Sequence, residues 1–425
     1  MAPPANNSAA AGGRKISQAA FDDLVKENIE DLGMDPAEAL EDAIQTLTLQ
    51  GVDLSAISTC LPGEANPLLQ CLDRLKQAVA STSHTLDAEA ENSLDTLSDL
   101  LSADRSKTAA IAVENGAVDL VLRACSTASS SSPRALNTLG LLLHDMQSTE
   151  AFRSCNGPRV LVSILKDGTE NVEVLKSAFS VVAAASTGNE VVKAEFMELK
   201  IDEIILQVLG RHGGKGGGGC VLSVYDAIVA LLTPDDPRVV ASEVYGYARR
   251  FAKIGIATAL VESLHGGLAA DGLVSATIAL KAVAVNDSIC KSIAESGGID
   301  VMLQCIDDSG EQGNKIVART CCSLLSKLAG SDSNKTAIVE KGGLKKLIQL
   351  SNRFSDDPSV LQEVMSIIRV ICLRSPDNAA LAIEAGAGEL AIQAMENFPA
   401  APQLQKNSCL MIRNLVVRNP ENRQV

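Results

Sequence analysis

The side chains best able to do chemistry in this 425-residue sequence are four histidines and eleven cysteines. His84, His144, His212 and His265 lie far apart, and none has a second histidine or cysteine three or four residues away, as a helical metal site needs. No Cys-x-x-Cys pair and no Gly-x-Ser-x-Gly motif occurs. We therefore expect no catalytic residue, no metal and no cofactor, and we expect reduced, buried thiols, Cys305, Cys321, Cys372 and Cys409 among them.

A glycine-rich stretch, GGKGGGG at 213–219, suggests a phosphate-binding loop, because backbone N–H groups in such a loop can bind phosphate oxygens. The motif requires a glycine five residues before the Gly-Lys pair and a Ser or Thr after it. Leu209 and Gly216 occupy those places. We interpret 211–219 as a flexible insertion.

Four basic residues recur at nearly equal spacing, as expected of side chains that line one binding surface of a repeat protein. Lys281, Lys327, Arg369 and Arg413 follow one another at intervals of 46, 42 and 44 residues. They meet on one surface only if the chain repeats at this period. If they do, they form a basic row that suits an acidic segment of a partner protein. The alternative is a set of solvated side chains whose alkyl stems cover apolar neighbours.

The chain does repeat at this period. The phrase IAVENGAVDLVL at 111–122 returns as SIAESGGIDVML at 292–303, AIVEKGGLKKLI at 337–348 and LAIEAGAGELAI at 381–392. Glycines 116, 157, 297, 342 and 386 mark its place, and Lys200 and Ile254 take that place in two degraded copies. Such self-similarity is typical of a helical solenoid, so we expect an all-α fold.

Each unit divides into three predicted helices, most clearly at 331–374. A short first helix ends at Gly-Gly, an amphipathic second helix follows, and the third, VLQEVMSIIRVICLR, is apolar on nearly every side. A helix of that kind must be covered on both sides. The third helices are therefore expected to stack between neighbouring repeats and to carry the four cations.

These three-helix units resemble armadillo repeats, with a close match at RNLVVRNPENRQ, 413–424. HEAT repeats have two helices, and the Gly break argues against them. The segment at 15–57 also resembles the leader of a member of the armadillo family. The resemblance implies a right-handed α-solenoid whose third helices line a groove, where an Asn binds the backbone of an extended peptide. Only Asn414 matches that Asn; the alternative is a structural role for it.

The predicted organisation has four parts. Residues 1–13 are expected to be a disordered tail, 14–101 an acidic helical region with helices near 16–32, 35–50, 65–81 and 87–101, and 102–418 seven repeats, irregular at 188–285. Residues 419–425 begin an eighth repeat that is incomplete or capped by a partner. Residues 1–101 hold 5 Lys and Arg against 17 Asp and Glu, and 102–425 hold 32 against 35. The acidic region could fold back on the basic row or compete with a partner for it.

Composition narrows the class of ligand. The formal charge is −15, Trp is absent and aromatic residues make up 2%, which disfavours nucleic acid. No apolar run is long enough for a membrane span, and no secretory signal is present. We expect an intracellular protein of the cytoplasm, with the nucleus as an alternative, that binds protein and no small-molecule substrate.

Two functions follow from this pattern. The first is a non-enzymatic scaffold that binds a peptide or helical segment of a partner in the groove. The alternative is a transport or chaperone-type adaptor for a client protein, which a regular Asn ladder would have supported. A second candidate surface is EVYGYARRFAK at 243–253, with Tyr245, Tyr247, Arg249 and Arg250, since Tyr and Arg favour interfaces. Its alternative is packing against the long insertion.

Overall fold

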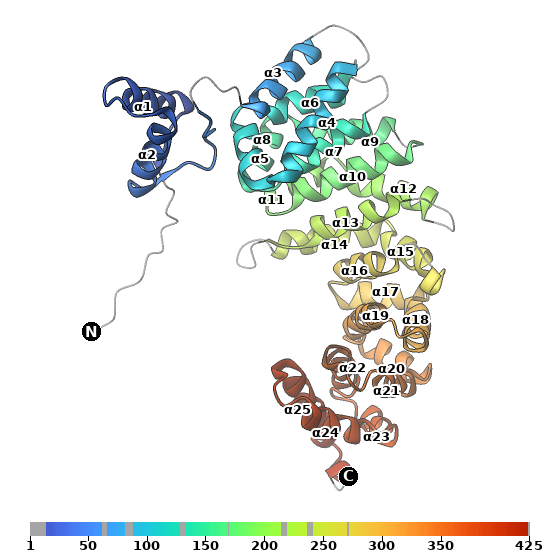
Figure 1. The fold of residues 1–425 in the computed structure, drawn as a ribbon. Helices are drawn as coiled ribbons and strands as arrows, with labels where there is room; N and C mark the ends of the chain where they lie inside the picture. Colours follow the sequence, from blue (N-terminus) through green and yellow to red (C-terminus); the bar gives the residue numbers. More distant parts are fainter. Residues whose placement is uncertain are drawn as a thin grey trace, which may run out of the picture. The chain divides into compact units, whose positions relative to one another are not determined.

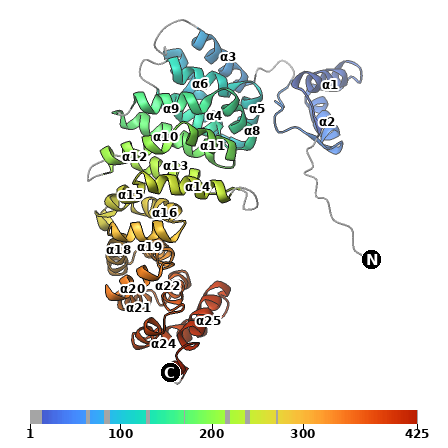
Figure 2. The same ribbon diagram turned by 180° about the vertical axis from the view of Figure 1, so that it is seen from behind.

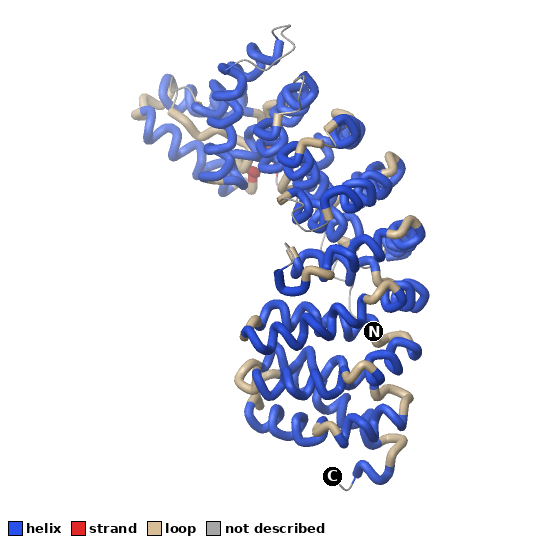
Figure 3. The backbone as a smooth tube through the Cα atoms, turned by 90° about the vertical axis from the view of Figure 1, so that its right-hand side faces the viewer, coloured by secondary structure: helices blue, strands red, loops and turns tan. Residues whose placement is uncertain are grey.

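A computed structural model describes residues 14–61, 66–80, 88–127, 132–168, 170–213, 219–235, 241–269 and 272–423. These residues are almost entirely α-helical and are joined by short loops (Figures 1 and 3), which confirms the all-α expectation. The expected tail at 1–13 and residues 214–218 of the Gly-rich insertion lie outside the described residues. The chain divides into two compact units, 1–160 and 161–425, which are treated separately below.

The first unit opens with a small module that has its own core. Two helices lie between two short strands in the chain. The strands pair in parallel, with Arg14 opposite Val52 and Lys15 opposite Asp53. Each helix begins at a side-chain cap: Ser17 Oγ accepts from the N–H of Ala20 and Asp35 from that of Ala37. The core consists of Phe21, Val25, Ala39, Ala43, Leu47 and Ile57. The elements are β1 (Arg14–Lys15), α1 (Gln18–Glu30), α2 (Pro36–Leu49) and β2 (Val52–Asp53).

The rest of the first unit already has the packing of the repeats. Helix α4 packs on α7 and α3 packs on α6. The hydroxyls of Ser98 on α4 and Thr138 on α7 lie 2.8 Å apart. Helices α3 and α4 therefore continue the solenoid stack into the acidic region, while the boundary placed at 101/102 stays a prediction. The elements are α3 (Pro67–Ala80), α4 (Ala88–Ala103), α5 (Arg105–Glu114), α6 (Ala117–Thr127), α7 (Pro133–Leu142), α8 (Met146–Ser154) and the start of α9 (Gly157–Asp167).

The second unit is a succession of three-helix layers, visible from both sides (Figures 1 and 2). Its elements are α10 (Val172–Ser186), α11 (Glu190–Glu198), α12 (Ile201–His212), α13 (Cys220–Leu232), α14 (Ala241–Lys253), α15 (Ile256–Leu264), η1 (Gly267–Ala269), α16 (Leu273–Val283), α17 (Asp287–Glu295), α18 (Gly298–Gln312), α19 (Lys315–Leu328), α20 (Asp332–Glu340), α21 (Gly343–Arg353), α22 (Pro358–Ile371), α23 (Pro376–Glu384), α24 (Ala387–Asn397), α25 (Pro402–Val416) and η2 (Pro420–Arg423).

Third helices stack on third helices, and second helices on second helices. Helix α10 packs on α13, and α13, α16, α19, α22 and α25 continue the row; α12, α15, α18, α21 and α24 form a parallel row. In α19 most side chains between Val317 and Leu328 are buried, and they lie on two sides of the helix. The exposed residues of α19 are Lys315, Ile316, Arg319 and Lys327. This confirms that the apolar third helices are covered on both sides.

The Gly-Gly pair between first and second helices has two separate functions. Gly342 has φ +75°, a left-handed conformation that costs a side-chain-bearing residue free energy. Gly343 has ordinary φ, but a Cβ there would lie 2.6 Å from the carbonyl oxygen of Ile338, so the close approach of the first helix excludes a side chain. The first glycine thus makes the turn and the second allows the packing.

In two repeats, one regular and one degraded, the turn lies one residue before or after the position that the sequence pattern predicted. Asn156 (φ +58°), and not Gly157, has the left-handed conformation in the second repeat, and Gly255 (φ +95°), and not Ile254, has it in the fourth. Lys200 (φ +63°) is in the expected place. Asn is the side chain that best tolerates this conformation, whereas Lys is strained in it.

Most of the thiols are buried, but Cys60 and Cys155 are half-buried and one of the four named in the sequence analysis is exposed. Eight cysteines, including Cys305, Cys321 and Cys372, are buried, but Cys409 on α25 is exposed. Burial raises the pKa of the Cys372 thiol to about 12, so it stays protonated and unreactive. Among the described residues, no helix combines the length and the apolarity that crossing a bilayer requires.

Candidate protein-binding surface of the third helices

Four consecutive third helices carry an excess of positive charge that the composition of the chain conceals. Helices α16, α19, α22 and α25 contain seven Lys and Arg and one acid, Glu363, which gives a net charge of +6 in a chain of net charge −15. The seven cations are Lys281, Lys315, Arg319, Lys327, Arg369, Lys406 and Arg413. The face that these helices expose is therefore basic.

The four cations of the predicted basic row occupy equivalent places. Lys281, Lys327, Arg369 and Arg413 each lie in the last turn of their own third helix. Three are exposed, and Arg369 is half-buried. A cation in a last turn also interacts favourably with the helix dipole, by about 0.3–1 kcal/mol, so position alone does not establish a binding role.

Direct contacts join the third helices that carry the basic row. Lys281 Nζ donates to Ser323 Oγ on α19 at 2.6 Å, and the hydroxyls of Ser326 and Ser366 lie 3.2 Å apart across α19 and α22. The Asn414 amide on α25 donates to the backbone oxygen of Arg369 on α22 at 2.8 Å. The structure therefore brings these segments of α16, α19, α22 and α25 side by side.

The cations of this surface lack the partners that other cations of the same repeats have. On α21 and the turn before it, Lys341 pairs with Asp300 at 2.7 Å, and Lys346 with Asp307 on α18. Among the described residues of α16, α19, α22 and α25, Lys315 is the one cation with an ion pair, to Asp357 at 3.1 Å. Within the described part of the chain, the other six third-helix cations form no ion pair. Their charges remain available to a ligand.

Apolar side chains adjoin the basic row. Ile278 on α16 is 42% exposed and Ile316 on α19 is 64% exposed. Ile278 lies three residues before Lys281, and Ile316, Ser323 and Lys327 are spaced by seven and four residues, which places them along one helix face. The surface therefore offers both charge and apolar area.

The second candidate surface, on α14, is divided by the structure. Tyr245 is 46% exposed and Arg249 is exposed. Tyr247 is half-buried, and its pKa is raised by burial and by nearby carboxylates such as Glu243. Arg250 donates to the backbone oxygen of Met197 at 2.7 Å.

Arg250 also forms an ion pair with a buried partner, Asp202 on α12, with an N–O distance of 2.7 Å. Arg250 therefore has a structural role. The alternative stated above was packing against the long insertion, whereas this contact is with α12. Tyr245 and Arg249 remain exposed on the other side of α14.

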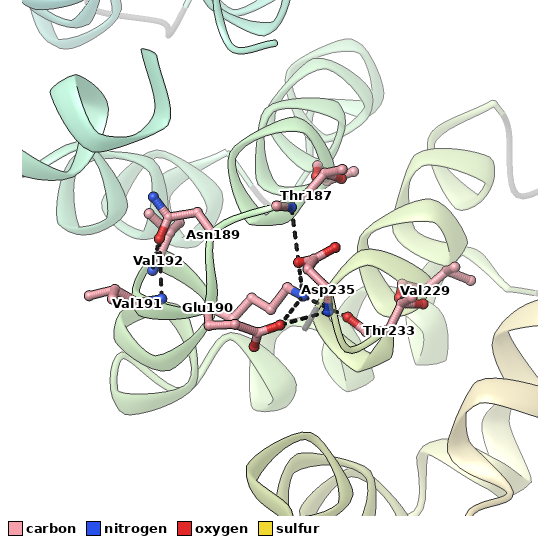
Figure 4. Close-up of polar contacts among 11 residues, drawn as sticks. Thr187, Asn189, Glu190, Val191, Val192, Val229, Thr233 and Asp235 are labelled. Atoms are coloured by element: carbon pink, nitrogen blue, oxygen red, sulfur yellow. Dashed lines mark hydrogen bonds and ion pairs between the residues drawn. The ribbon is translucent and has the colours of Figure 1, made fainter. Parts of the chain in front are cut away.

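One ionic cluster was missed by sequence reasoning. Lys193 on α11 is fully buried, and its ammonium donates to Glu190 Oε1 at 3.0 Å, to Asp235 Oδ2 and to the carbonyl oxygen of Thr233 at 2.6 Å. Glu190, Thr233 and Asp235 converge in Figure 4. Asp235 also accepts from the N–H of Gly188 at 2.9 Å.

The same device recurs elsewhere in the array. Lys335 Nζ donates to Asp332, three residues earlier, at 2.7 Å and to the carbonyl oxygen of Leu373, at the end of the next third helix, at 3.1 Å. The shared signal is an acid three residues before a lysine in a first helix. Each contact holds the first helix of a repeat against the chain that directly follows the third helix of the same repeat, so its function is structural.

Metal-binding side chains do not cluster near these surfaces in the described residues. In the part of the chain that the structure describes, no group of three or more His, Cys, Asp and Glu side chains is placed to hold a metal ion.

Asn414 and Arg413 form one further contact, in which the Arg413 guanidinium donates to Asn414 Oδ1 at 3.3 Å. The Asn414 amide is therefore engaged within the protein, on both its donor and its acceptor side.

Comparison with known proteins agrees with this architecture. Residues 13–86 match the model of the armadillo repeat-containing protein 6 N-terminal domain. The chain is 25% identical over 402 residues to armadillo repeat-containing protein 6 of Homo sapiens, which covers 89% of this chain and 78% of the human protein. The Drosophila melanogaster homolog is 26% identical over 395 residues, covering 87% and 80%.

Solved structures share the fold. A structure from work on a phosphorylation switch that controls the interaction between cadherin and beta-catenin has a TM-score of 0.63 at 17% identity, covering 95% of this chain and 70% of that one. A crystal structure of an engineered protein has a TM-score of 0.61 at 19% identity, covering 93% and 98%. The chain therefore has the fold of an armadillo-repeat solenoid and is similar to armadillo repeat-containing protein 6 over most of its length.

Proposed function

We propose that this protein is a non-enzymatic interaction scaffold that binds an acidic segment of a partner protein on the third helices α16, α19, α22 and α25. One observation carries the proposal: six of the seven cations on these helices lack an ion pair within the described residues, whereas Lys341 and Lys346 of the same repeats are paired. The armadillo fold suggests a protein-interaction scaffold in general terms.

The charge balance supports an acidic protein segment over other ligands. A net charge of +6 on four helices attracts carboxylates, yet the chain as a whole, at −15, repels nucleic acid and anionic membrane surfaces. Ile278 and Ile316 add exposed apolar area, which a peptide with mixed acidic and apolar side chains would cover. We place the complex in the cytoplasm, since the free cysteines are suited to a reducing compartment.

Affinity capture from cell lysate tests this proposal. The baits are the wild-type chain, the variant Lys327→Glu, Arg369→Glu, Arg413→Glu, and a control with an equal charge change at the exposed residues Lys26, Lys76 and Lys253. We expect a set of proteins that the wild-type and control baits retain and the third-helix variant loses. If all three baits retain the same proteins, the third-helix surface is not the binding site.

A further inference from the structure

Two arginines on adjacent third helices have unused hydrogen-bonding capacity at one place. The structure gives the Arg369 guanidinium no hydrogen-bond acceptor within the described residues, and its Nε atom is buried without a partner. Arg413 has a single acceptor, Asn414 Oδ1, at 3.3 Å. A buried, unpaired N–H group destabilises the free protein, and so it favours any ligand that supplies an acceptor.

Asn414 holds these two arginines in register. Its amide nitrogen donates to the backbone oxygen of Arg369 at 2.8 Å, while its amide oxygen accepts from Arg413. One side chain thereby fixes the last turn of α22 against the last turn of α25. We classify Asn414 as a positioning residue, because its own polar atoms are engaged within the protein.

Among the described residues no carboxylate forms an ion pair with either arginine, and their own two helices supply little negative charge. Helix α25 contains no Asp or Glu, and the one acid of α22, Glu363, lies six residues, almost two helical turns, before Arg369. Like charges on adjacent helices repel each other, and an anion bound to both would remove that repulsion. A guanidinium presents N–H donors in a planar fork that matches the two oxygens of a carboxylate, which an ammonium group does not.

From these observations we propose that Arg369 and Arg413 form a carboxylate clamp, which binds one Asp or Glu side chain of the partner segment through guanidinium hydrogen bonds. Lys281 and Lys327 then contribute only point charges along the same surface. This inference rests on the proposed function. It assigns oriented hydrogen bonds to the two arginines and charge attraction alone to the two lysines.

Charge-conserving substitutions separate the two contributions. The probe is a fluorescein-labelled peptide of about ten glutamates, titrated at about 50 mM NaCl to limit screening. The variants are Arg369→Lys with Arg413→Lys, and the matched control Lys281→Arg with Lys327→Arg, whose melting temperatures are compared with wild type. We expect the first pair to weaken binding about tenfold, from the loss of charge-assisted hydrogen bonds, and the control to bind at least as tightly as wild type.

The outcomes distinguish the clamp from the proposed function. If the Arg→Lys variant binds the peptide as tightly as wild type, the clamp is wrong and the surface acts by charge alone. If a peptide of the same length carrying phosphoserines shows the loss and the glutamate peptide does not, the carboxylate assignment is overturned. If the wild-type chain and the variant Lys327→Glu, Arg369→Glu, Arg413→Glu bind the peptide equally, the proposed function fails as well.

Discussion

The ammonium group of Lys193, fully buried on α11, forms an ion pair with the carboxylate of Asp235, which lies 42 residues later and three residues after the end of α13. Glu190 completes the pairing at 3.0 Å. The contact holds the first helix of the third repeat against the chain that follows its third helix, at the place where the repeat pattern in the sequence is weakest.

Replacement of Lys193 by Met leaves two carboxylates partly buried without their cation. We expect a loss of stability of about 3–5 kcal/mol, measured by hydrogen exchange of the α11 and α13 amides in increasing urea. Lys335→Met is the matched control. Its acidic partner Asp332 is 94% exposed, so we expect about half that loss. Equal losses for the two variants would show that the buried pairing around Lys193 contributes nothing special.

Lys200 has a left-handed backbone that its side chain opposes. Lys200→Gly is expected to raise the free energy of unfolding by about 1 kcal/mol, because glycine adopts φ +63° without steric strain. The exposed ion pair with Glu203, which would be lost, contributes little. Gly342→Ala, at φ +75°, should have the opposite sign. Chemical denaturation of both variants measures the effect, and a destabilised Lys200→Gly protein would contradict the strain argument.

Much of this fold could be predicted from the sequence, because glycine turns and apolar third helices recur at a fixed period. The turn at Asn156 was not predicted, although Asn tolerates positive φ, because glycine occupies this place in most of the other repeats. The β1–β2 pair was also missed, because two-residue strands carry no alternating pattern.

The binding surface was predictable only in part. The spacing of Lys281, Lys327, Arg369 and Arg413 indicated equivalent places on successive helices, and the structure puts all four in last turns. Whether a cation is paired depends on residues about 40 positions away, as for Lys341 with Asp300, and local sequence does not reveal this. The burial of Lys193 escaped prediction for the same reason.

Asp357, the N-cap of α22, makes stability depend on pH. Burial opposes its ionisation, but hydrogen bonds from Ser359, Lys315 and the N–H of Val360 outweigh that effect and lower its pKa from 3.8 to about 2. The ionised form is favoured in the folded state, so this contribution is complete above pH 3.8 and is lost as the pH falls toward 2.

Asp357→Asn tests this assignment, because the amide keeps an oxygen for the cap but cannot titrate. We expect the variant to be less stable than wild type at neutral pH and the difference to shrink between about pH 4 and pH 2, as followed by urea unfolding at each pH. A difference that does not change with pH would assign the effect to the cap alone.

Site-specific photo-cross-linking in cells tests the central claim most directly, because it reports which face of the repeats contacts a partner. A benzophenone amino acid is placed at Ile278 or Ile316 on the third helices, and at the exposed Gln304 or Asn352 on the second helices as controls. We predict protein adducts from Ile278 and Ile316, reduced when Lys327→Glu, Arg369→Glu and Arg413→Glu are added, and few from the controls. Adducts mainly from Gln304 and Asn352, unaffected by these substitutions, would contradict a binding surface on the third helices.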